Sequence, residues 1–577
     1  MSRADAVARI QSDPIGLEIM WSRLVNVVEE MWLTVCRTAF SLVIAEAQDF
    51  ACELLDKDGE TLAHSPRAMP VFNLTLPRAV KALLKAYPAE TLKPGDVLVT
   101  NDPWLCAGHL FDIAIVTPAF RNGQLVGLMG TVGHVSDIGG TKDSLHAREI
   151  YEEGLQIPPM KLFDAGKPNE TLISLIRQNV RNGEQVLGDI FSFVAANKLG
   201  AERLDAFMHD YGMHDLCALA EVVQGLSEKA MRDAIRAMPD GEYRSTITNN
   251  PLGEKITYPV LVKVEGDSIT VDFDGAPPQL PQGGLNSTLN YTAAHATYPL
   301  KCMLTPTVRG NAGCYRPFTV TAPEGSILNP TYPAAVNLRT RTGWYLAPNI
   351  FAALSEAAPG MVQSFTGLAV AANIYGQDGN GDFYSDMLFC GGGQGGSDRK
   401  DGHSSLLWPT SAANTSIELM ESRVPVLLLE KSFLADSGGA GKCRGGVGQV
   451  VRFRKRDEDG LEMLVSVYPE GVDNPIPGLF GGHSGGGARG MVHSADGHLL
   501  RDCGTGALVS LHHTDQIVEL VLGGGAGFGN PEERDPAAVA RDLALGFVTP
   551  EHAAQFYQSS AVPAGTGAEP QPDTAWA

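Results

Sequence analysis

The stretch TNDPWLCAGHLFDIAIVTPAFRNGQLVGLMGTVGHVSDIGG, residues 100–140, organises the part of the chain around it. It contains two apolar runs, residues 113–116 and 125–132, on either side of the turn Arg121-Asn122-Gly123. Apolar runs of this length around an Asn-Gly turn predict two strands paired as an antiparallel hairpin. In such a hairpin the start of the first strand lies beside the end of the second.

Histidines and an aspartate stand at those two outer ends. His109 and Asp112 precede the first strand and His134 follows the second, so the hairpin would bring the three side chains together. Imidazole and carboxylate ligands suit a divalent ion of intermediate hardness such as Zn, Mn or Fe. With three or four protein ligands, such an ion keeps a position open to polarise a carbonyl or activate water. The alternative is that both histidines are ordinary hydrogen-bonded side chains near turns.

Three further carboxylates are candidate catalytic residues. Asp137, ahead of Gly139-Gly140, either orients His134 or belongs to an Asx turn. Glu149 and Glu153 are one helical turn apart, so both could face one site, with one of them acting as a general base. The alternative for this pair is a solvated acidic face.

The rest of the first half of the chain alternates helix and strand patterns. Apolar residues at helical spacing after Asp13-Pro14 predict one long amphipathic helix over residues 15–44. Residues 48–56 have the pattern of a strand that ends in a hairpin turn, with Asp49 at its start. Helical periodicity returns in residues 73–87 and in several segments of residues 170–237.

The second half of the chain has a different character. Alternating strand patterns begin near residue 241, and the chain to about residue 530 is predicted to be mainly strand and glycine-rich turn, with one helical patch at residues 344–358. A closing helix or pair of helices is predicted over residues 535–557, and a mobile tail from Ser559.

We therefore expect an α+β protein in three parts. They are an N-terminal mixed α/β domain with the metal site on strand ends (1–237), a larger β-rich, glycine-rich domain (238–530), and a C-terminal helical segment with the tail (531–577).

Composition excludes several classes of function. The 66 acidic and 44 basic residues give a net charge of -22, which argues against sequence-independent binding to nucleic acid. The nine cysteines are dispersed and form no CxxC pair, which favours buried thiols in a reducing compartment, so we expect a cytoplasmic protein. The first thirty residues lack the pattern of a signal peptide, and no apolar run approaches about 18 residues. Neither secretion nor a membrane span is expected.

The glycine-rich segments do not match nucleotide-binding loops. No GxxxxGK[ST] pattern occurs, and residues 523–529 are followed by Asn530-Pro531 rather than by a helix that could receive a phosphate. We therefore do not expect this chain to bind ATP. Neither a GxSxG elbow nor a cysteine nucleophile signature is present.

Ordered motifs along the chain carry a family resemblance. They are Asp13-Pro14-Ile15, Gln48-Asp49-Phe50, Asn101-Asp102-Pro103, Gly108-His109 with Asp112, His134 with Asp137-Ile138-Gly139-Gly140, Glu153-Gly154-Leu155 with Ile157-Pro158-Pro159, Pro323-Glu324-Gly325-Ser326, residues 436–441 with Arg444-Gly445-Gly446, and Gly527-Phe528-Gly529 with Arg534-Asp535-Pro536. Over nearly its whole length the chain resembles the hydantoinase B/oxoprolinase family. This family comprises the B-type subunits of ATP-dependent hydantoinases, 5-oxoprolinases, lactamases and the acetone and acetophenone carboxylases.

The resemblance implies a metal-bearing subunit of a hetero-oligomer. Its partner would be a separate A-type chain of the acetate and sugar kinase, Hsp70 and actin type, which binds the ATP. Carried over position by position, the metal ligands would be Asp49, His109, Asp112 and His134. Relatives commonly have a second histidine directly after the last of these, where this chain has Val135.

The resemblance also implies a division of labour in the reaction. The partner would phosphorylate the amide or enol oxygen of the substrate, and the metal-bearing chain would complete the reaction at a cation that faces this oxygen. The leading expectation is an ATP-dependent hydrolase of cyclic amides such as hydantoins, 5-oxoproline or lactams. Two alternatives stay open: an ATP-dependent carboxylase of ketones, and a non-catalytic scaffold that holds the ATP-binding partner.

Overall fold

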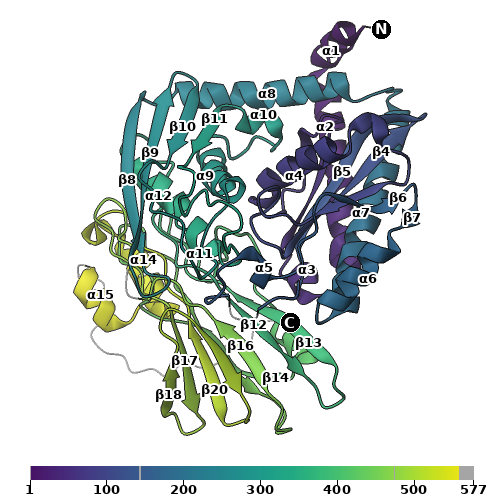
Figure 1. The fold of residues 1–577 in the computed structure, drawn as a ribbon. Helices are drawn as coiled ribbons and strands as arrows, with labels where there is room; N and C mark the ends of the chain where they lie inside the picture. Colours follow the sequence, from purple (N-terminus) through teal and green to yellow (C-terminus); the bar gives the residue numbers. More distant parts are fainter. Residues whose placement is uncertain (1, 142–143, 473–474, 558–577) are drawn as a thin grey trace, which may run out of the picture.

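The computed structural model describes residues 2–141, 144–472 and 475–557. Within these ranges the chain has an α+β fold, as the sequence predicts, with four β-sheets and helices packed around them (Figure 1). None of the described helices is both long and apolar enough to span a membrane. The tail predicted to be mobile lies outside the described residues, and the division into three domains stays a prediction.

The N-terminal sheet has seven antiparallel strands in the order β2-β1-β5-β4-β3-β6-β7. The predicted hairpin lies at its centre, and its turn is formed by Asn122 and Gly123, both with positive φ. Such φ values give a two-residue turn whose twist matches that of the strands. The strands are β1 (Phe50–Leu55), β2 (Thr61–His64), β3 (Val97–Thr100), β4 (Asp112–Arg121), β5 (Gln124–His134), β6 (Met160–Asp164) and β7 (Lys167–Pro168).

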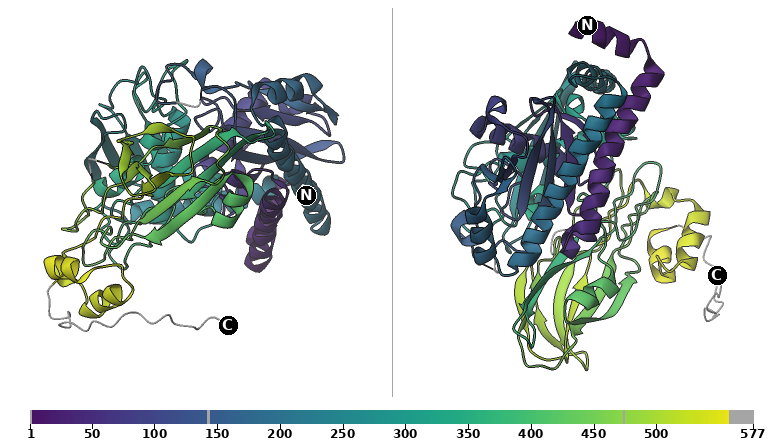
Figure 2. Two further views of the ribbon diagram at one scale, coloured as in Figure 1. Left: turned by 90° about the horizontal axis from the view of Figure 1, so that it is seen from below. Right: turned by 90° about the vertical axis from the view of Figure 1, so that its right-hand side faces the viewer.

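Helices cover both faces of this sheet. The long helices α2 (Pro14–Thr38) and α7 (Gly183–Asp210) run side by side on one face, and α4 (Phe72–Ala86) packs on the other (Figure 2). Two glycines of β5 lie on opposite faces of the sheet. Gly133 packs against Phe193 of α7, and Gly130 packs against Leu76 of α4. The remaining N-terminal helices are α1 (Arg3–Gln11), α3 (Leu42–Ala45), η1 (Ala89–Thr91), α5 (Ile150–Glu153), α6 (Glu170–Asn179) and α8 (Cys217–Arg236).

The first long helix ends earlier than the predicted residue 44. It stops at Thr38, and the chain begins the short α3 at Leu42. The Asp189 carboxylate accepts the N–H groups of Phe40 and Ser41, at 2.7 and 3.1 Å. The apolar periodicity predicts that the helix continues here, but these N–H groups bind a side chain from a distant part of the chain instead of helical carbonyls.

The second sheet is accompanied by a helix that the sequence analysis did not predict. The strands are β8 (Gly241–Asn249), β9 (Ile256–Glu265), β10 (Ser268–Asp272) and β11 (Phe318–Thr321), and the helix is α9 (Leu289–Leu304). The expectation of mainly strand and turn was wrong here. Nearly every side chain of α9 from Tyr291 to Leu300 is buried, so the helix has no polar stripe to reveal its period, and Pro299 lies within it. Shorter helices follow at α10 (Ala312–Tyr315), α11 (Thr340–Gly343) and α12 (Leu346–Ala353), the last inside the predicted helical patch.

Two further sheets face each other as a β-sandwich, drawn in green and yellow in Figure 1. Their strand orders are β13-β12-β16-β19 and β14-β15-β20-β17-β18, and side chains from both sheets share one apolar core. The elements are β12 (Val370–Gln377), β13 (Phe383–Cys390), α13 (Ile417–Arg423), β14 (Val426–Phe433), β15 (Gln449–Lys455), β16 (Met463–Val467), β17 (Arg489–Ser494), β18 (Leu499–Asp502), β19 (Ala507–Leu511) and β20 (Gln516–Val521).

The glycine-rich segments pack backbone against backbone beside the sandwich. Gly393, Gly446 and Gly525 donate their N–H groups to the carbonyls of Gly523, Gln394 and Gly446, at 2.8 to 3.0 Å. The predicted closing helices follow as α14 (Pro536–Ala544) and α15 (Pro550–Phe556), after η2 (Pro531–Glu533). Close backbone approach explains why glycine is used so heavily in these segments.

Candidate metal centre

The β4–β5 hairpin brings the two histidines and the aspartate together. Asp112, the first residue of β4, lies opposite His134, the last residue of β5. His109 lies three residues before Asp112, in the loop that enters β4. One ligand-capable atom from each of these side chains lies within 4.8 Å of the other two. The hairpin register therefore forms a compact cluster of three potential metal ligands.

The potential ligand atoms of this cluster lie close to one another. Nε2 of His109 lies 2.8 Å from Oδ1 of Asp112, and Nδ1 of His134 lies 3.3 Å from the same oxygen. Both His109 Nε2 and Asp112 Oδ1 are buried and have no hydrogen-bond partner within the described part of the chain, although buried polar atoms are normally paired. Adjacent ligands around an ion with bonds of about 2.0–2.2 Å are about 3 Å apart. The donor set and its spacing thus fit a divalent ion.

Asp49 lies beside the cluster but outside the group of three. It directly precedes β1, which pairs with β5, and its main-chain oxygen accepts the N–H of His134 at 3.0 Å. Its Oδ1 is also buried and has no hydrogen-bond partner among the described residues. Burial raises the pKa of the Asp49 carboxyl to about 6, and the negative charge of Asp112 adds to this effect while His134 opposes it.

Asp112 is the electrostatic centre of the site. Burial alone would raise the pKa of its carboxyl, but the adjacent His109 ring and the charge of Arg339 hold that pKa well below its usual range. Arg339 Nη2 donates to Oδ2 of Asp112 at 2.6 Å. Because the arginine takes Oδ2, the ionised carboxylate presents Oδ1 to the two histidines.

His109 is held from its far side. Its Nδ1 lies 3.2 Å from the main-chain oxygen of Asn337 and 3.1 Å from the Oδ1 of the same residue. Burial lowers the pKa of His109 to about 4, helped by the charge of Arg339 and opposed by Asp112. The imidazole is therefore neutral near pH 7. If its proton is on Nδ1 and is donated to Asn337, Nε2 keeps a lone pair directed at the cluster.

Asn337 and Arg339 are the two site residues that the sequence analysis missed. Besides Asp112, Arg339 donates from Nε to the Ala107 carbonyl at 3.1 Å, and its guanidinium stacks 4.4 Å from the ring centre of Tyr291. Arg339 is 4% exposed and lies in a segment otherwise rich in buried apolar residues. The signal in the sequence was an arginine within a largely apolar segment. It does not indicate that Arg339 lies close to the histidines.

The structure does not bring Glu149 and Glu153 to one site. Glu149 is exposed and caps α5, whereas Glu153 is 2% exposed. The Glu153 carboxylate accepts the main-chain N–H groups of Val336 and Asn337 at 2.8 to 3.0 Å, and burial raises its pKa to about 7. The expectation that both carboxylates face one site was wrong, because the contact with residues 336–337 turns one of them inward. Glu153 fixes the loop that carries Asn337.

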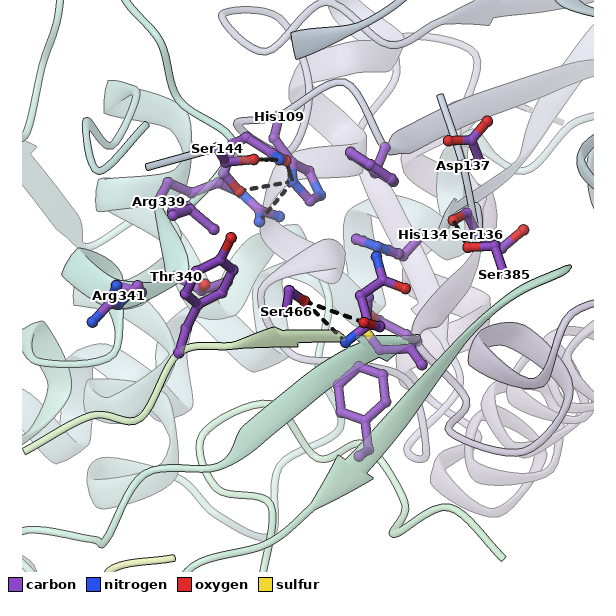
Figure 3. A pocket seen from close by; sticks show the side chains of 18 of the residues that line it. His109, His134, Ser136, Asp137, Ser144, Arg339, Thr340, Arg341, Ser385 and Ser466 are labelled. Atoms are coloured by element: carbon purple, nitrogen blue, oxygen red, sulfur yellow. Dashed lines mark hydrogen bonds between the residues drawn. The ribbon is translucent and has the colours of Figure 1, made fainter. Parts of the chain in front are cut away.

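Asp137 is bound by an arginine. Arg181 donates to its carboxylate from Nη1 at 2.6 Å and from the main-chain N–H at 2.5 Å. Asp137 lies in the wall of the same cavity as His134, and Figure 3 shows it on the far side of His134 from His109. Its carboxylate is thus committed to Arg181, and the expected role of orienting His134 has no support among the described contacts.

The cluster opens into a cavity of about 180 Å³ where three parts of the fold meet. The N-terminal sheet supplies Asp49, His109 and His134, and the segment around α11 supplies a second wall. The third wall is one face of the β12–β13–β16 sheet. Figure 3 shows His109, Ser144 and Arg339 grouped on one side, with Ser466 of β16 across from them.

Comparison with known proteins gives a consistent result. A family model described as hydantoinase B/oxoprolinase matches residues 13–531. A protein from Pseudomonas sp. (strain NS671) that is named as the B-type chain of a D-/L-hydantoinase is 31% identical, over 94% of this chain and 95% of that protein. The beta chain of the caprolactamase of Pseudomonas jessenii is 30% identical, over 93% and 94% of the two chains.

Solved structures agree with these sequence matches. The crystal structure of the ATP-dependent caprolactamase from Pseudomonas jessenii superposes with a TM-score of 0.84 at 27% identity, over 94% of this chain and 95% of that chain. A nucleotide-free acetone carboxylase structure superposes with a TM-score of 0.83 at 19% identity, over 95% and 80%, which shows a shared fold. Since the family model spans most of the chain and close to full-length relatives match it, this chain belongs to the hydantoinase B/oxoprolinase family.

Proposed function

We propose that this chain is the metal-bearing subunit of an ATP-dependent enzyme that opens cyclic amides, with ATP held on a separate A-type partner. One observation carries the proposal. His109 Nε2, Asp112 Oδ1 and Asp49 Oδ1 are buried without a hydrogen-bond partner among the described residues, and His134 Nδ1 lies 3.3 Å from Asp112 Oδ1. Buried atoms of metal-ligand type without hydrogen-bond partners are costly unless a cation compensates them.

His109, Asp112 and His134 would hold the ion, with Asp49 as the fourth ligand, and Zn, Mn or Fe suits this donor set. A bound ion would polarise the substrate oxygen and lower the pKa of a bound water. The chain's own residues prepare this site. Arg339 keeps Asp112 ionised, and Oδ1 of Asn337 lies 3.1 Å from Nδ1 of His109, where it would accept a proton on Nδ1 and so fix the ring. The ring of Phe111 stacks on His134 at 5.1 Å, which limits rotation of that imidazole.

The proposed reaction starts with phosphorylation of the amide oxygen by the partner. The ring carbon of the resulting imidate phosphate is electrophilic, so water adds to it, the ring nitrogen takes a proton and the C–N bond breaks, which leaves an acyl phosphate. A second water then hydrolyses the acyl phosphate to the carboxylate and phosphate. Caprolactamase is similar in sequence and structure over more than nine-tenths of this chain, whereas acetone carboxylase at 19% identity supports the fold alone. This difference favours hydrolysis over carboxylation.

The site is tested by metal analysis of the purified chain and of three variants. We expect about one bound ion per chain in the wild type and in His214→Ala, whose side chain is exposed and remote. His109→Ala and His134→Ala should both lose the ion and the ATP-dependent ring opening measured with the A-type partner. Full metal occupancy in both variants contradicts the proposed site.

The alternatives give different results in the same assays. Label from bicarbonate in a product acid, formed by the two-chain enzyme with ATP and a ketone, indicates a carboxylase. Normal turnover of His109→Ala together with weaker assembly with the partner indicates a scaffold.

A further inference from the structure

One wall of the cavity lies across from the candidate metal ligands. One face of the third sheet forms it, because side chains alternate along a strand and every second one points to the same side. In the strand register Asn373 of β12 lies between Ser466 of β16 and Met387 of β13, so these three side chains form a row across the sheet. All three line the cavity, together with Phe383 and Phe389 from β13.

The other face of this sheet is buried in the sandwich core. Ala372 and Ile374 of β12 and Leu388 of β13 alternate with the cavity residues and are fully buried there. The wall is therefore fixed by core packing on its rear side. A rigid wall can discriminate between substrates by shape and polarity.

Asn373 is the polar group in the middle of this wall. Its main-chain atoms are bound to Ser466, at 3.1 Å for the N–H and 3.5 Å for the carbonyl. Its carboxamide takes part in no hydrogen bond with the described residues. A carboxamide carries both a donor and an acceptor. It can therefore pair with a ring nitrogen either as an amide N–H or as the lone pair of an imidate.

The apolar part of the wall surrounds this group. Met387 and Phe383 are half-buried and Phe389 is 5% exposed, and their apolar surfaces form the rest of this wall. A methionine beside aromatic rings adapts to apolar groups of different shape.

The arginine charges in the described cavity lining are already compensated, and the lining also contains the Asp49 carboxylate. Each arginine of that lining is paired with a carboxylate that is itself at most 5% exposed. The pairs are Arg339–Asp112, Arg341–Glu470 and Arg181–Asp137. A carboxylate on the substrate would need a counter-charge when it leaves water, since an unpaired buried charge is costly. The paired arginines do not provide one at the cavity surface, because Nη1 of Arg341, which has no hydrogen-bond partner among the described residues, is itself fully buried.

From these observations we infer that the wall around Asn373 recognises the substrate, and that the substrate is an uncharged cyclic amide with an apolar body rather than a carboxylate-bearing lactam. Asn373 pairs with the ring nitrogen while Met387 and Phe389 receive the hydrocarbon part. The oxygen that becomes phosphorylated faces the candidate metal centre. This inference rests on the proposed function and specifies its substrate class.

The charge preference is tested with the enzyme assembled with its A-type partner, ATP and metal. Two substrates with the same ring are compared, 2-pyrrolidone and 5-oxoproline, and we expect a kcat/KM at least about tenfold higher for the uncharged one. Met387→Lys places a cation in this wall and should shift the substrate preference toward 5-oxoproline. Met361→Lys is the matched control, because Met361 is 54% exposed and outside the cavity lining.

The role of Asn373 is tested with Asn373→Ala. We expect kcat/KM for the uncharged amide to fall about tenfold or more, because a hydrogen bond to the ring nitrogen is lost. Metal content and thermal stability should stay at the wild-type level. Asn380→Ala changes an exposed residue in the turn of the same β12–β13 hairpin and should have no effect.

The possible failures are distinct. A higher kcat/KM for 5-oxoproline, or full activity of Asn373→Ala, overturns the substrate inference and leaves the proposed function standing. If the metal-loaded complex opens neither kind of cyclic amide with ATP, the proposed function fails and the inference fails with it.

Discussion

Arg339 is the residue on which the geometry of the candidate metal centre depends most. It binds Oδ2 of Asp112 at 2.6 Å and the Ala107 carbonyl at 3.1 Å, and its Nη1 lies 3.1 Å from Nδ1 of His109. The residue thus fixes one candidate ligand directly and the loop that carries another. It does so without itself being a metal ligand, since its guanidinium has no lone pair to offer.

Replacement of Arg339 should weaken metal binding. We expect Arg339→Met to lower metal affinity about 10- to 100-fold, because loss of a group that orients a ligand has this typical cost. Competition with a chelator at fixed pH measures the change. Arg203→Met, at an exposed position of α7, should bind metal like the wild type, and equal affinity of the two variants would contradict the role of Arg339.

At the scale of elements, the glycine-rich segments show how backbone packing dictates sequence. A Cβ on Gly525 would lie 2.0 Å from the carbonyl oxygen of Gln394, far inside van der Waals contact. Gly225, in the middle of α8, has open space around its Cβ position. Backbone packing therefore requires glycine at position 525, whereas position 225 has room for a side chain. Neither glycine has a positive φ that would explain its use.

Alanine at these two positions should have opposite effects on stability. We expect Gly525→Ala to lower the free energy of unfolding by about 3 kcal/mol or more, because the backbone must move apart. Gly225→Ala should raise it by up to about 1 kcal/mol, the difference in helix propensity. Urea unfolding of both variants checks the contrast, and a Gly525→Ala variant as stable as the wild type would refute the packing argument.

The short helix α3 connects the N-terminal sheet and its helices to the sandwich through two buried aspartates. Asp386 of β13 accepts the N–H of Leu42 at 3.2 Å, next to Asp189 of α7, which binds the preceding residues. Burial raises the pKa of Asp386 to about 7, although main-chain N–H groups oppose the shift. The side chain of Leu42 itself lies in the sandwich core.

This raised pKa makes stability depend on pH in a defined direction. An unfolded aspartate has a pKa of about 3.9, so between about pH 4 and pH 7 the folded chain binds a proton that the unfolded chain has lost. Stability therefore falls as pH rises through that range, by on the order of 4 kcal/mol for a shift of this size.

Asp386→Asn should remove this pH-dependent loss, because the amide is uncharged at every pH and keeps an oxygen acceptor for Leu42. Chemical denaturation between pH 4 and pH 8 measures it, with the exposed Asp274→Asn as control. The same pH slope in wild type and Asp386→Asn would show that Asp386 is not the titrating group.

At the scale of the whole molecule, a buried ionic network fastens the C-terminal helices to the glycine-rich region. Asp542 of α14 is 2% exposed and receives Arg534 Nη2 at 2.6 Å and Arg444 Nε at 3.2 Å. Arg534 also binds Asp401 at 2.7 Å. Both arginines come from motifs that carry the family resemblance, which gives those motifs a structural role.

Loss of Asp542 should release this connection. Asp542→Ala leaves two buried guanidinium groups without their shared carboxylate, so we expect a loss of about 3–5 kcal/mol in stability. Thermal unfolding measures the loss, and limited proteolysis should cleave near α14 sooner. Asp515→Ala, at an exposed position, serves as control, and an unchanged melting temperature for Asp542→Ala would contradict the prediction.

The sequence by itself determined the features that depend on neighbours along the chain. An Asn-Gly turn between two apolar runs fixed the β4–β5 hairpin, and its register placed Asp112 opposite His134. The ordered motifs identified the family, and helical spacing predicted α2, α4 and the closing helices. In each case the information lies in a local period or in an exact local pattern, which needs no knowledge of packing.

Only the tertiary structure decided what surrounds that hairpin. Arg339 and Asn337 reach the cluster from more than 200 positions away, and Asn373 faces it from a separate sheet. Glu149 and Glu153 are one helical turn apart in the sequence, yet Glu153 is buried against residues 336–337 and Glu149 is exposed. Long-range packing sets these positions and burials, and no local period in the sequence encodes it. The candidate ligands could therefore be predicted from the sequence, but the groups that orient them and the wall that faces them could not.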